Sequence, residues 1–433
     1  MRTLNTWLNG QRIGTLSEGD GLWRFDYDAA WINTPGSFDL SPALARRKPS
    51  HVDLGTQRPV QWYFDNLLPE ETLREALLKE SGIKGDDAFA LLEYLGAESA
   101  GSLVLLPPDA EAKPRVGLKP LADEDLSRRI RDLPRQSLST SAPKRMSVAG
   151  AQHKLLVVYR DGNLFEPVGS EPSTHILKPN HPSDDYASSV INEYAMQRLG
   201  ALLELGSPPV HRRYVPEPVY VIERFDRFVD KEGITHRRHV IDACQLLNKS
   251  RSFKYTSASL QTLVDCVDHC RIQPIASLRL YRWLVFNLLI GNDDNHLKNI
   301  SFRVSGEGIE VAPPYDMLST AVYHTVAYAG ERGRWPAVKL MIPLPGAATF
   351  GEVTREAVLA AGEVLGLSRR ISERELDRLA TAMPGVLRAV STGIAAENAD
   401  GPAAAKAFFA GELRLLRAVE HVVLPFMLGR VKV

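Results

Sequence analysis

The segment 280–302 reads LYRWLVFNLLIGNDDNHLKNISF, and it decides the fold that we expect. Its first half is apolar and predicts a buried helix that ends at Gly291, because glycine adopts the positive φ that closes many helices. Two acids, a histidine, a lysine and several asparagines follow at once. Polar side chains packed this densely beside a buried helix require a reason, since such groups are otherwise found mostly on the surface.

The spacing within this polar run is typical of one kind of catalytic loop. Asp294 and Asn299 are separated as D-x-x-x-x-N, the separation that places a proton-accepting carboxylate beside a magnesium-binding amide in kinases. A further acid, Asp316, follows in APPYDMLS. Mg²⁺ favours a few protein oxygens together with phosphate oxygens. Asn299 and Asp316 are therefore candidate ligands of magnesium ions that bridge ATP phosphates, which leaves Asp294 for the acceptor hydroxyl.

A lone D-x-x-x-x-N is more typical of a helix end followed by a solvated loop. Three upstream features favour a kinase loop over a solvated helix end. They are Gly150 in a small-residue turn between strands, Lys178 at a strand end, and Glu193 in the next helix. In this order they match the phosphate-covering loop, the strand lysine and the helix glutamate that hold ATP in a bilobal kinase. The sequence therefore predicts phosphoryl transfer, with Lys178 and Glu193 as an ion pair.

Composition limits the classes of protein that fit. The 433 residues carry 52 basic and 52 acidic side chains, so any contact with DNA must be local or supplied by a partner. Three cysteines form no disulfide framework, and the N-terminus has no apolar signal core. The longest apolar run, Trp283–Ile290, is too short for a membrane span. We expect a cytoplasmic protein without membrane contact.

The order of the patterns predicts an α+β fold of the bilobal, protein-kinase-like type in four parts. Residues 1–112 form a small mixed α/β domain with a hairpin turn at Asn9-Gly10, and 113–145 form a linker with one helix. Residues 146–240 form a β-rich small lobe with the phosphate loop, an Asp161-Gly162 hairpin and the hinge. Residues 241–433 form a large helical lobe that carries the catalytic and metal-binding loops.

Several separate motifs also occur in an order that resembles the HipA-type toxin kinases of bacterial toxin–antitoxin systems. They are SVAGAQHK at 147–154, THILKP around Lys178, NEYAMQRLG around Glu193, ERFDR at 223–227, GNDDNHLKN at 291–299 and PPYD ending in Asp316. The resemblance covers nearly the whole chain. It implies an ATP- and Mg²⁺-dependent protein serine/threonine kinase that arrests growth of its own cell, with glutamyl-tRNA synthetase as protein substrate. It also implies control by a HipB-type DNA-binding antitoxin, with operator DNA contacted only within that complex.

The same resemblance implies a role for individual residues. Asp294 would be the catalytic base, His296 and Lys298 would lie beside the transferring phosphate, and Asn299 and Asp316 would hold magnesium. The remaining nucleotide contacts would come from Ala149, Gly150, Ala151, Gln152, His153 and Lys154 in the phosphate loop, Lys178, Glu223, Arg224 and Phe225 in the hinge, and Tyr315. Ser147 is similar to the family's autophosphorylated serine. A phosphate there would repel the phosphates of ATP, so we hypothesise that it expels the loop and inactivates the enzyme.

Departures from better-known kinases leave alternatives open. Asn292 stands where many kinases have the histidine of H-x-D, and His296 two residues after Asp294 looks like the loop of phosphoinositide lipid kinases. A lipid or small-molecule kinase is therefore an alternative, as is a catalytically silent corepressor. Which of His296 and Lys298 neutralises the γ-phosphate is also open. Cys266 and Cys270 in DCVDHC invite a zinc interpretation, but their one-turn spacing favours buried helix cysteines.

Overall fold

A computed structural model describes residues 1–433 except 100, 111–114, 144–145, 147–148 and 433. The chain forms two units, each built from several segments. The first unit contains Met1–Lys178, Glu223–Phe253 and Ser301–Ala312, and the second contains Pro179–Ile222, Lys254–Ile300 and Pro313–Val433. The four-part division made from the sequence stays a prediction.

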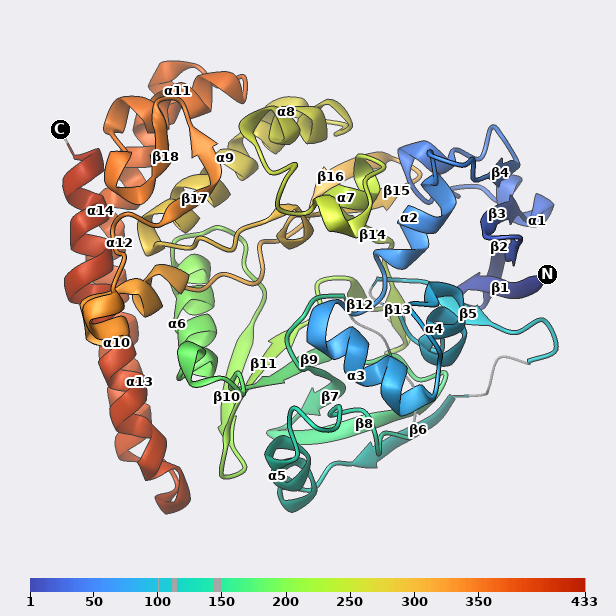
Figure 1. Ribbon diagram of the computed structural model, residues 1–433, viewed down its shortest axis with the longest axis horizontal. Coiled ribbons are helices and arrows are strands. Elements are labelled where there is room, and N and C mark those ends of the chain that lie inside the picture. The colour runs from blue at the N-terminus through green and yellow to red at the C-terminus, as the bar shows by residue number, and fades with distance from the viewer. Residues whose placement is uncertain (100, 111–114, 144–145, 147–148, 433) are drawn as a thin grey trace. The chain divides into compact units, whose positions relative to one another are not determined.

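The first unit begins with an antiparallel sheet in the strand order β4-β3-β2-β1-β5 (Figure 1). Its strands are β1 (Arg2–Leu8), β2 (Gln11–Gly19), β3 (Leu22–Tyr27), β4 (Ser50–Val52) and β5 (Val104–Leu106), and its helices are α1 (Ala29–Ile32), α2 (Pro59–Asp65), α3 (Glu71–Ser81) and α4 (Ala88–Leu95). The predicted hairpin turn is confirmed, since Leu8 pairs with Gln11 and both Asn9 and Gly10 have positive φ. Alternate strand residues such as Leu4, Leu16 and Phe25 are fully buried.

A second sheet in the first unit pairs β9 with β7, β7 with β8 and β8 with β6, all antiparallel. The segments are β6 (Arg115–Pro120), α5 (Asp123–Arg131), β7 (Leu155–Arg160), β8 (Asn163–Gly169) and β9 (His175–Pro179). The Asp161-Gly162 hairpin is confirmed, because Arg160 pairs with Asn163 across it. Further elements of this unit are β12 (Arg227–Val229), β13 (Thr235–Arg237), β14 (Val240–Asp242), α7 (Ala243–Leu246), β15 (Ser301–Ser305) and β16 (Gly308–Val311).

The second unit is mainly helical. Its elements are α6 (Ser189–Leu202), β10 (Val210–Tyr214), β11 (Pro218–Glu223), α8 (Leu260–Asp268), α9 (Gln273–Ile290), α10 (Val326–Ala329), β17 (Lys339–Leu344), β18 (Ala347–Thr349), α11 (Arg355–Val364), α12 (Arg369–Ala399), α13 (Lys406–Ala418) and α14 (Leu424–Val431). Helix α9 is apolar on nearly every side because α8, α11, α12 and α14 all pack against it. Cys266 in α8 and Cys270, two residues after the end of α8, are both buried and free, and Cys270 Sγ donates to the Cys266 carbonyl at 3.4 Å.

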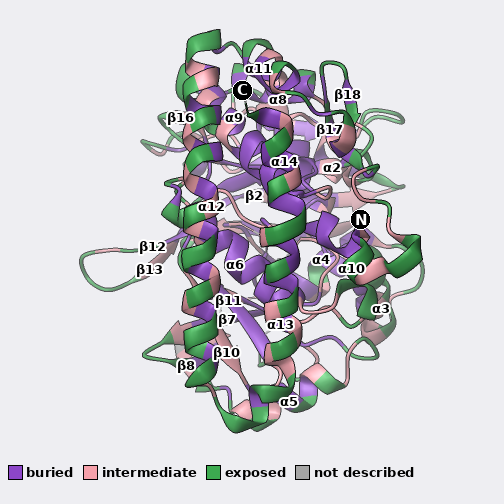
Figure 2. Ribbon diagram, turned by 90° about the vertical axis from the view of Figure 1, so that its left-hand side faces the viewer, coloured by how far each residue is buried: buried purple, intermediate pink, exposed green. Residues whose placement is uncertain are grey.

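Helix α12 has an apolar stripe and a polar stripe. Among the residues that the structure describes, it is the one helix long and apolar enough to cross a membrane by length and composition, a test that core helices also pass. Figure 2 shows buried and exposed positions alternating along it. Its buried side chains, which include Leu379, Met383, Leu387 and Ile394, belong to the side of the helix that packs against α6, α9 and α11. We interpret α12 as an amphipathic helix of the second unit's core.

Gly291 ends α9 in the left-handed conformation with φ 67°, and its N–H bonds to the carbonyls of the preceding turn. A Cβ atom at this position would lie 2.7 Å from Val423 Cγ1 and 2.9 Å from Ala321 Cβ. Both the backbone conformation and the close packing therefore require glycine. This glycine sets the direction in which the chain enters the polar run that follows.

We predict that Gly291→Ala destabilises the protein by about 1–3 kcal/mol, because alanine would be strained at this φ and would crowd two buried side chains. Urea denaturation followed by circular dichroism measures the change. Gly385→Ala is the matched control: it lies within α12 with no atom near its Cβ position and should stabilise by about 0.5–1 kcal/mol. Equal stability of Gly291→Ala and the parent would contradict the packing argument.

Candidate active site

The polar run after α9 is held in one conformation by buried hydrogen bonds within the second unit. Asn292 Nδ2 donates to Asn287 Oδ1 at 2.8 Å, and the Asp294 N–H donates to Asn292 Oδ1 at 3.0 Å. The Asp293 N–H donates to Thr320 Oγ1 at 2.7 Å. The turn is thus tied both to α9 and to the segment that follows Asp316. Asn292, which stands where other kinases have histidine, serves here to orient the turn.

A short 3-10 helix, Leu297–Asn299, brings the predicted loop residues together. Asn299 Nδ2 donates to the Asp294 carbonyl at 2.9 Å, and the His296 N–H donates to the same carbonyl at 2.9 Å. Tyr315 Oη donates to the Lys298 carbonyl at 2.6 Å, which places the residue before Asp316 against this loop. The side chains of His296, Lys298 and Asn299 are largely buried.

Helix α6 holds the segment that carries Asp316. Asn192 accepts from the Ser319 N–H at 2.8 Å and donates to the Ser319 carbonyl at 3.0 Å, so one amide side chain satisfies both backbone groups of that residue. Gln197 Nε2 donates to the Pro314 carbonyl at 2.8 Å. These contacts bracket Asp316, whose φ of 56° lies in the left-handed region. Such a backbone is uncommon outside glycine and is tolerated better by aspartate than by most residues.

The Asp294 carboxyl is affected by several groups of the second unit. Burial, together with the smaller effect of the negative charges of Asp316 and Asp293, raises its pKa to about 7, although the charge of Lys254 and a hydrogen bond from Tyr255 oppose the rise. Burial also raises the pKa of Tyr220, with smaller contributions from the charges of Glu193 and Asp316. Asp316 therefore acts electrostatically on Asp294, and both Asp316 and Glu193 act on Tyr220.

Lys254 and Tyr255 are site residues that the sequence did not reveal. The Leu297 N–H donates to the Lys254 carbonyl at 3.2 Å, and Lys254 Nζ lies 4.7 Å from the centre of the Tyr255 ring. That ring packs edge-on against His296 with centroids 5.0 Å apart. The motif SRSFKYT lies about forty residues before Asp294 and has no spacing signature, so only the fold brings it to the loop.

The oxygens at this site suit a magnesium ion. Asn299 offers an amide oxygen and Asp294 and Asp316 offer carboxylates, and like charges that raise a carboxyl pKa are relieved by a divalent cation. Within the described residues, no three histidine, cysteine, aspartate or glutamate side chains are arranged to hold a metal by themselves. At magnesium sites in kinases, phosphate and water oxygens complete the coordination.

The predicted nucleotide contacts of the first unit lie in two places. In the phosphate loop, Gly150 has φ 106° and forms a parallel bridge with Pro69, and its carbonyl accepts from the Glu70 N–H at 3.3 Å. Lys154 Nζ donates to the Ala149 carbonyl at 2.7 Å, which closes the loop around Ala151, Gln152 and the buried His153. Ser147, the predicted autophosphorylation site, lies outside the described residues.

The other place is the segment from Glu223 to Phe225. The Arg224 N–H donates to the Thr174 carbonyl at 2.9 Å, and Arg303 Nη2 donates to the Phe225 carbonyl at 3.4 Å. Lys178 is buried in β9 of the same unit. The predicted ion pair between Lys178 and Glu193 joins residues of different units and stays a prediction, as does ATP binding between two lobes.

A buried helix followed by a turn with an Asp and an Asn, and by a second Asp further along the chain, is an arrangement found in kinases. Comparison with known proteins gives the family. The HipA-like C-terminal domain family matches residues 146–385, and the HipA N-terminal domain family matches residues 4–106. The chain belongs to the HipA family, as the resemblance predicted.

Individual relatives agree with this assignment. A putative kinase of Sinorhizobium fredii is 36% identical over 335 residues, which cover 75% of this chain and 78% of that protein. The serine/threonine-protein kinase toxin HipA of Shewanella oneidensis is 31% identical over 344 residues, or 74% and 76% of the two chains. A solved complex of HipA, HipB and operator DNA from Shewanella oneidensis MR-1 contains a chain that matches with a TM-score of 0.78, at 27% identity and over 99% of both chains. The predicted α+β, kinase-like fold is confirmed.

We predict that the pKa of Asp294, in protein without nucleotide or metal, lies near 7 and responds to its neighbours in opposite directions. Asp316→Asn should lower it by removing a like charge, and Lys254→Met should raise it by removing an opposite charge. Carboxyl-carbon NMR measures both shifts. Glu356→Gln, in an exposed ion pair on α11, should leave the pKa unchanged. An ordinary aspartate value near 4 in the parent would contradict the described environment.

Proposed function

We propose that this protein is an ATP- and Mg²⁺-dependent protein serine/threonine kinase that acts as the toxin of a toxin–antitoxin system. The observation that carries the proposal is the mutual electrostatic influence of Asp294 and Asp316 beside Asn299, in a chain of the HipA family. A kinase does little covalent work of its own and accelerates transfer through positioning and charge neutralisation. Groups of the second unit would both position the reactants and neutralise the charge of the phosphates.

Each loop residue has a proposed part in the transfer. Asp294 would take the proton of the acceptor hydroxyl as its oxygen bonds to the γ-phosphorus and the bond from that phosphorus to the bridging oxygen breaks, releasing ADP. Asn299 and Asp316 would hold Mg²⁺, which when bound neutralises charge on the ATP phosphates. His296 and Lys298 would lie beside the transferred phosphoryl group, and Lys298 is the better neutralising group because lysine is fully charged at pH 7.

The first unit would supply the remaining nucleotide contacts. Residues Ala149 to Lys154 would cover the phosphates, Lys178 would contact the α- and β-phosphates, and the backbone from Glu223 to Phe225 would face adenine. Tyr315, against the Lys298 carbonyl, would fix the position of Asp316 and line the nucleotide. A phosphate on Ser147 would place negative charge next to the phosphate loop and switch the enzyme off.

The cellular role follows from the family. The structural neighbour from Shewanella oneidensis occurs in a complex with HipB and operator DNA, which supports a HipB-type antitoxin as partner and DNA contact within that complex. We propose glutamyl-tRNA synthetase as the protein substrate, and a cytoplasmic setting in which its phosphorylation slows translation. A kinase for a lipid or small molecule is the second candidate, favoured by His296 at two positions after Asp294.

Incubation with Mg-ATP and glutamyl-tRNA synthetase, followed by intact-mass measurement of both proteins, tests the proposal. The parent should add a phosphate to the synthetase and to itself. Asp294→Asn should be slower by about 10²- to 10⁴-fold, because it cannot accept the hydroxyl proton.

Glu356→Gln is the control, since Glu356 on α11 forms an exposed ion pair with Arg369 and is not among the groups that act on Asp294. It should retain most of the activity. Phosphate transfer by Asp294→Asn at the parent's rate would refute the assignment of the base. A phosphorylated lipid or metabolite from a lysate, with no labelled protein, would favour the second candidate.

A further inference from the structure

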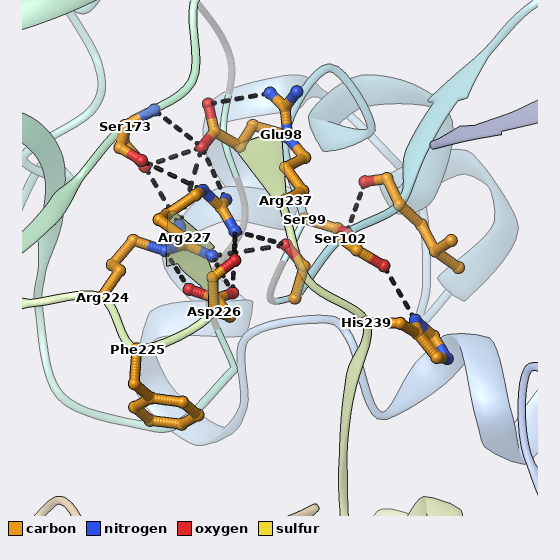
Figure 3. A network of polar contacts seen from close by, with 12 residues as sticks. Glu98, Ser99, Ser102, Ser173, Arg224, Phe225, Asp226, Arg227, Arg237 and His239 are labelled. Carbon is orange, nitrogen blue, oxygen red and sulfur yellow. Dashed lines mark hydrogen bonds and ion pairs between the residues drawn. The ribbon is translucent and has the colours of Figure 1, made fainter. Parts of the chain in front are cut away.

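A carboxylate of the N-terminal part of the chain lies at the centre of a buried polar network in the first unit (Figure 3). Glu98 is fully buried, and its Oε1 accepts from the Ser173 N–H at 3.0 Å, from Ser173 Oγ at 2.7 Å and from Arg227 Nη2 at 3.1 Å. The same oxygen forms an ion pair with Arg224 Nη1 at 3.6 Å. The other carboxylate oxygen of Glu98, Oε2, lies 3.9 Å from Arg237 Nη2. One side chain thus joins three arginines and a backbone segment.

Two groups of the N-terminal part of the chain, the Glu98 carboxylate and the Gly101 carbonyl, contact both arginines of the ERFDR motif. The Gly101 carbonyl accepts from Arg227 Nη1 at 3.1 Å and from Arg224 Nη2 at 3.4 Å, in addition to their contacts with Glu98. Asp226 completes the network through two hydrogen bonds from Arg224, at 2.9 and 2.7 Å. Figure 3 shows these side chains turned toward Glu98, whereas the ring of Phe225 points away from the network.

The charges in this network depend on Glu98. Glu98 and Asp226 both form ion pairs with the buried arginines of this network. Burial and the charge of Arg224 lower the pKa of Arg227 to about 10, which still leaves it protonated near neutral pH. Loss of the Glu98 charge would remove a negative charge that lies beside three buried arginines, and buried charges without compensation are costly.

Arg224 lies within the backbone segment that would face adenine, and Arg227 follows two residues after it. We propose that Glu98 is a positioning residue for nucleotide binding, which holds the segment from Glu223 to Arg227 in place through its two arginines. The inference rests on the proposed function, because it assumes that this segment contacts ATP. Under this proposal, the N-terminal part of the chain contributes to nucleotide binding.

A second contact from the same part of the chain supports this view. The bridge between Pro69 and Gly150, with the Glu70 N–H donating to the Gly150 carbonyl, reaches the phosphate loop. Residues 69–70 and Glu98 thus act on the two places where the first unit would contact ATP. Neither contact involves a residue that would touch the nucleotide through its own side chain.

Glu98→Gln tests the proposal in the full chain, because it keeps the size of the side chain and one acceptor for Ser173 while removing the charge. We expect the Kd for Mg-ATP, measured by calorimetry, to rise by about tenfold. Hydrogen exchange of the Arg224 and Arg227 amides should become faster in protein without nucleotide. If Glu98→Gln does not fold, Glu98→Asp replaces it: it keeps the charge on a shorter side chain and should change both readouts in the same direction.

Glu166→Gln is the matched control. Glu166 is also fully buried in the first unit, and it pairs with Arg129 at 2.6 Å, away from the ERFDR motif. It should lower thermal stability to a similar degree without a change in Kd or in exchange at Arg224. Equal loss of ATP affinity in both variants, or unchanged affinity in Glu98→Gln, would overturn the proposal. A parent that binds no Mg-ATP would instead refute the proposed function, and amide exchange would still decide whether Glu98 holds the segment.

Discussion

Two carboxylates of like charge, Asp294 and Asp316, are held within electrostatic reach of each other in a partly buried setting, and the candidate site depends on this constraint. Without a compensating cation such an arrangement is unfavourable, since each negative charge hinders ionisation of the other. It persists because the surrounding backbone is fixed by other interactions. An unfavourable free energy of this kind is typical of functional sites, where strain and charge repulsion are relieved when a ligand binds.

Hydrogen bonds from amide side chains hold the backbone around Asp294 and Asp316 in place. Asn287 and Asn292 tie the turn to α9, and Asn192 and Gln197 tie the segment around Asp316 to α6. Asn192, Asn287 and Asn292 each donate and accept, whereas Gln197 donates to the Pro314 carbonyl, and these bonds satisfy backbone groups that a loop would otherwise leave unpaired. The apolar helix α9 supplies the rigid base, and Gly291 gives the chain the direction it needs at the helix end.

The sequence predicted those parts of the structure that depend on local chemistry. The hairpin turns at Asn9-Gly10 and Asp161-Gly162, the end of α9 at Gly291 and the loop from Asp294 to Asn299 all have signatures within a few residues. Lys254, Asn192 and Glu98 were missed because their partners lie about 40, 127 and 75–139 residues away and no spacing rule links them. The fold alone creates these contacts, so a motif search finds the candidate reacting groups and not the side chains that hold them in position.

Binding of Mn²⁺ tests the central claim most directly, because this ion accepts the same oxygen ligands as Mg²⁺ and its free form is counted by electron paramagnetic resonance. The account predicts that the parent, in the presence of ATP, removes free Mn²⁺ from solution. Asp316→Ala should remove little more than ATP does by itself, and Glu356→Gln should behave as the parent. Equal binding of Mn²⁺ by Asp316→Ala and the parent would contradict a shared site for the metal and the nucleotide at these side chains.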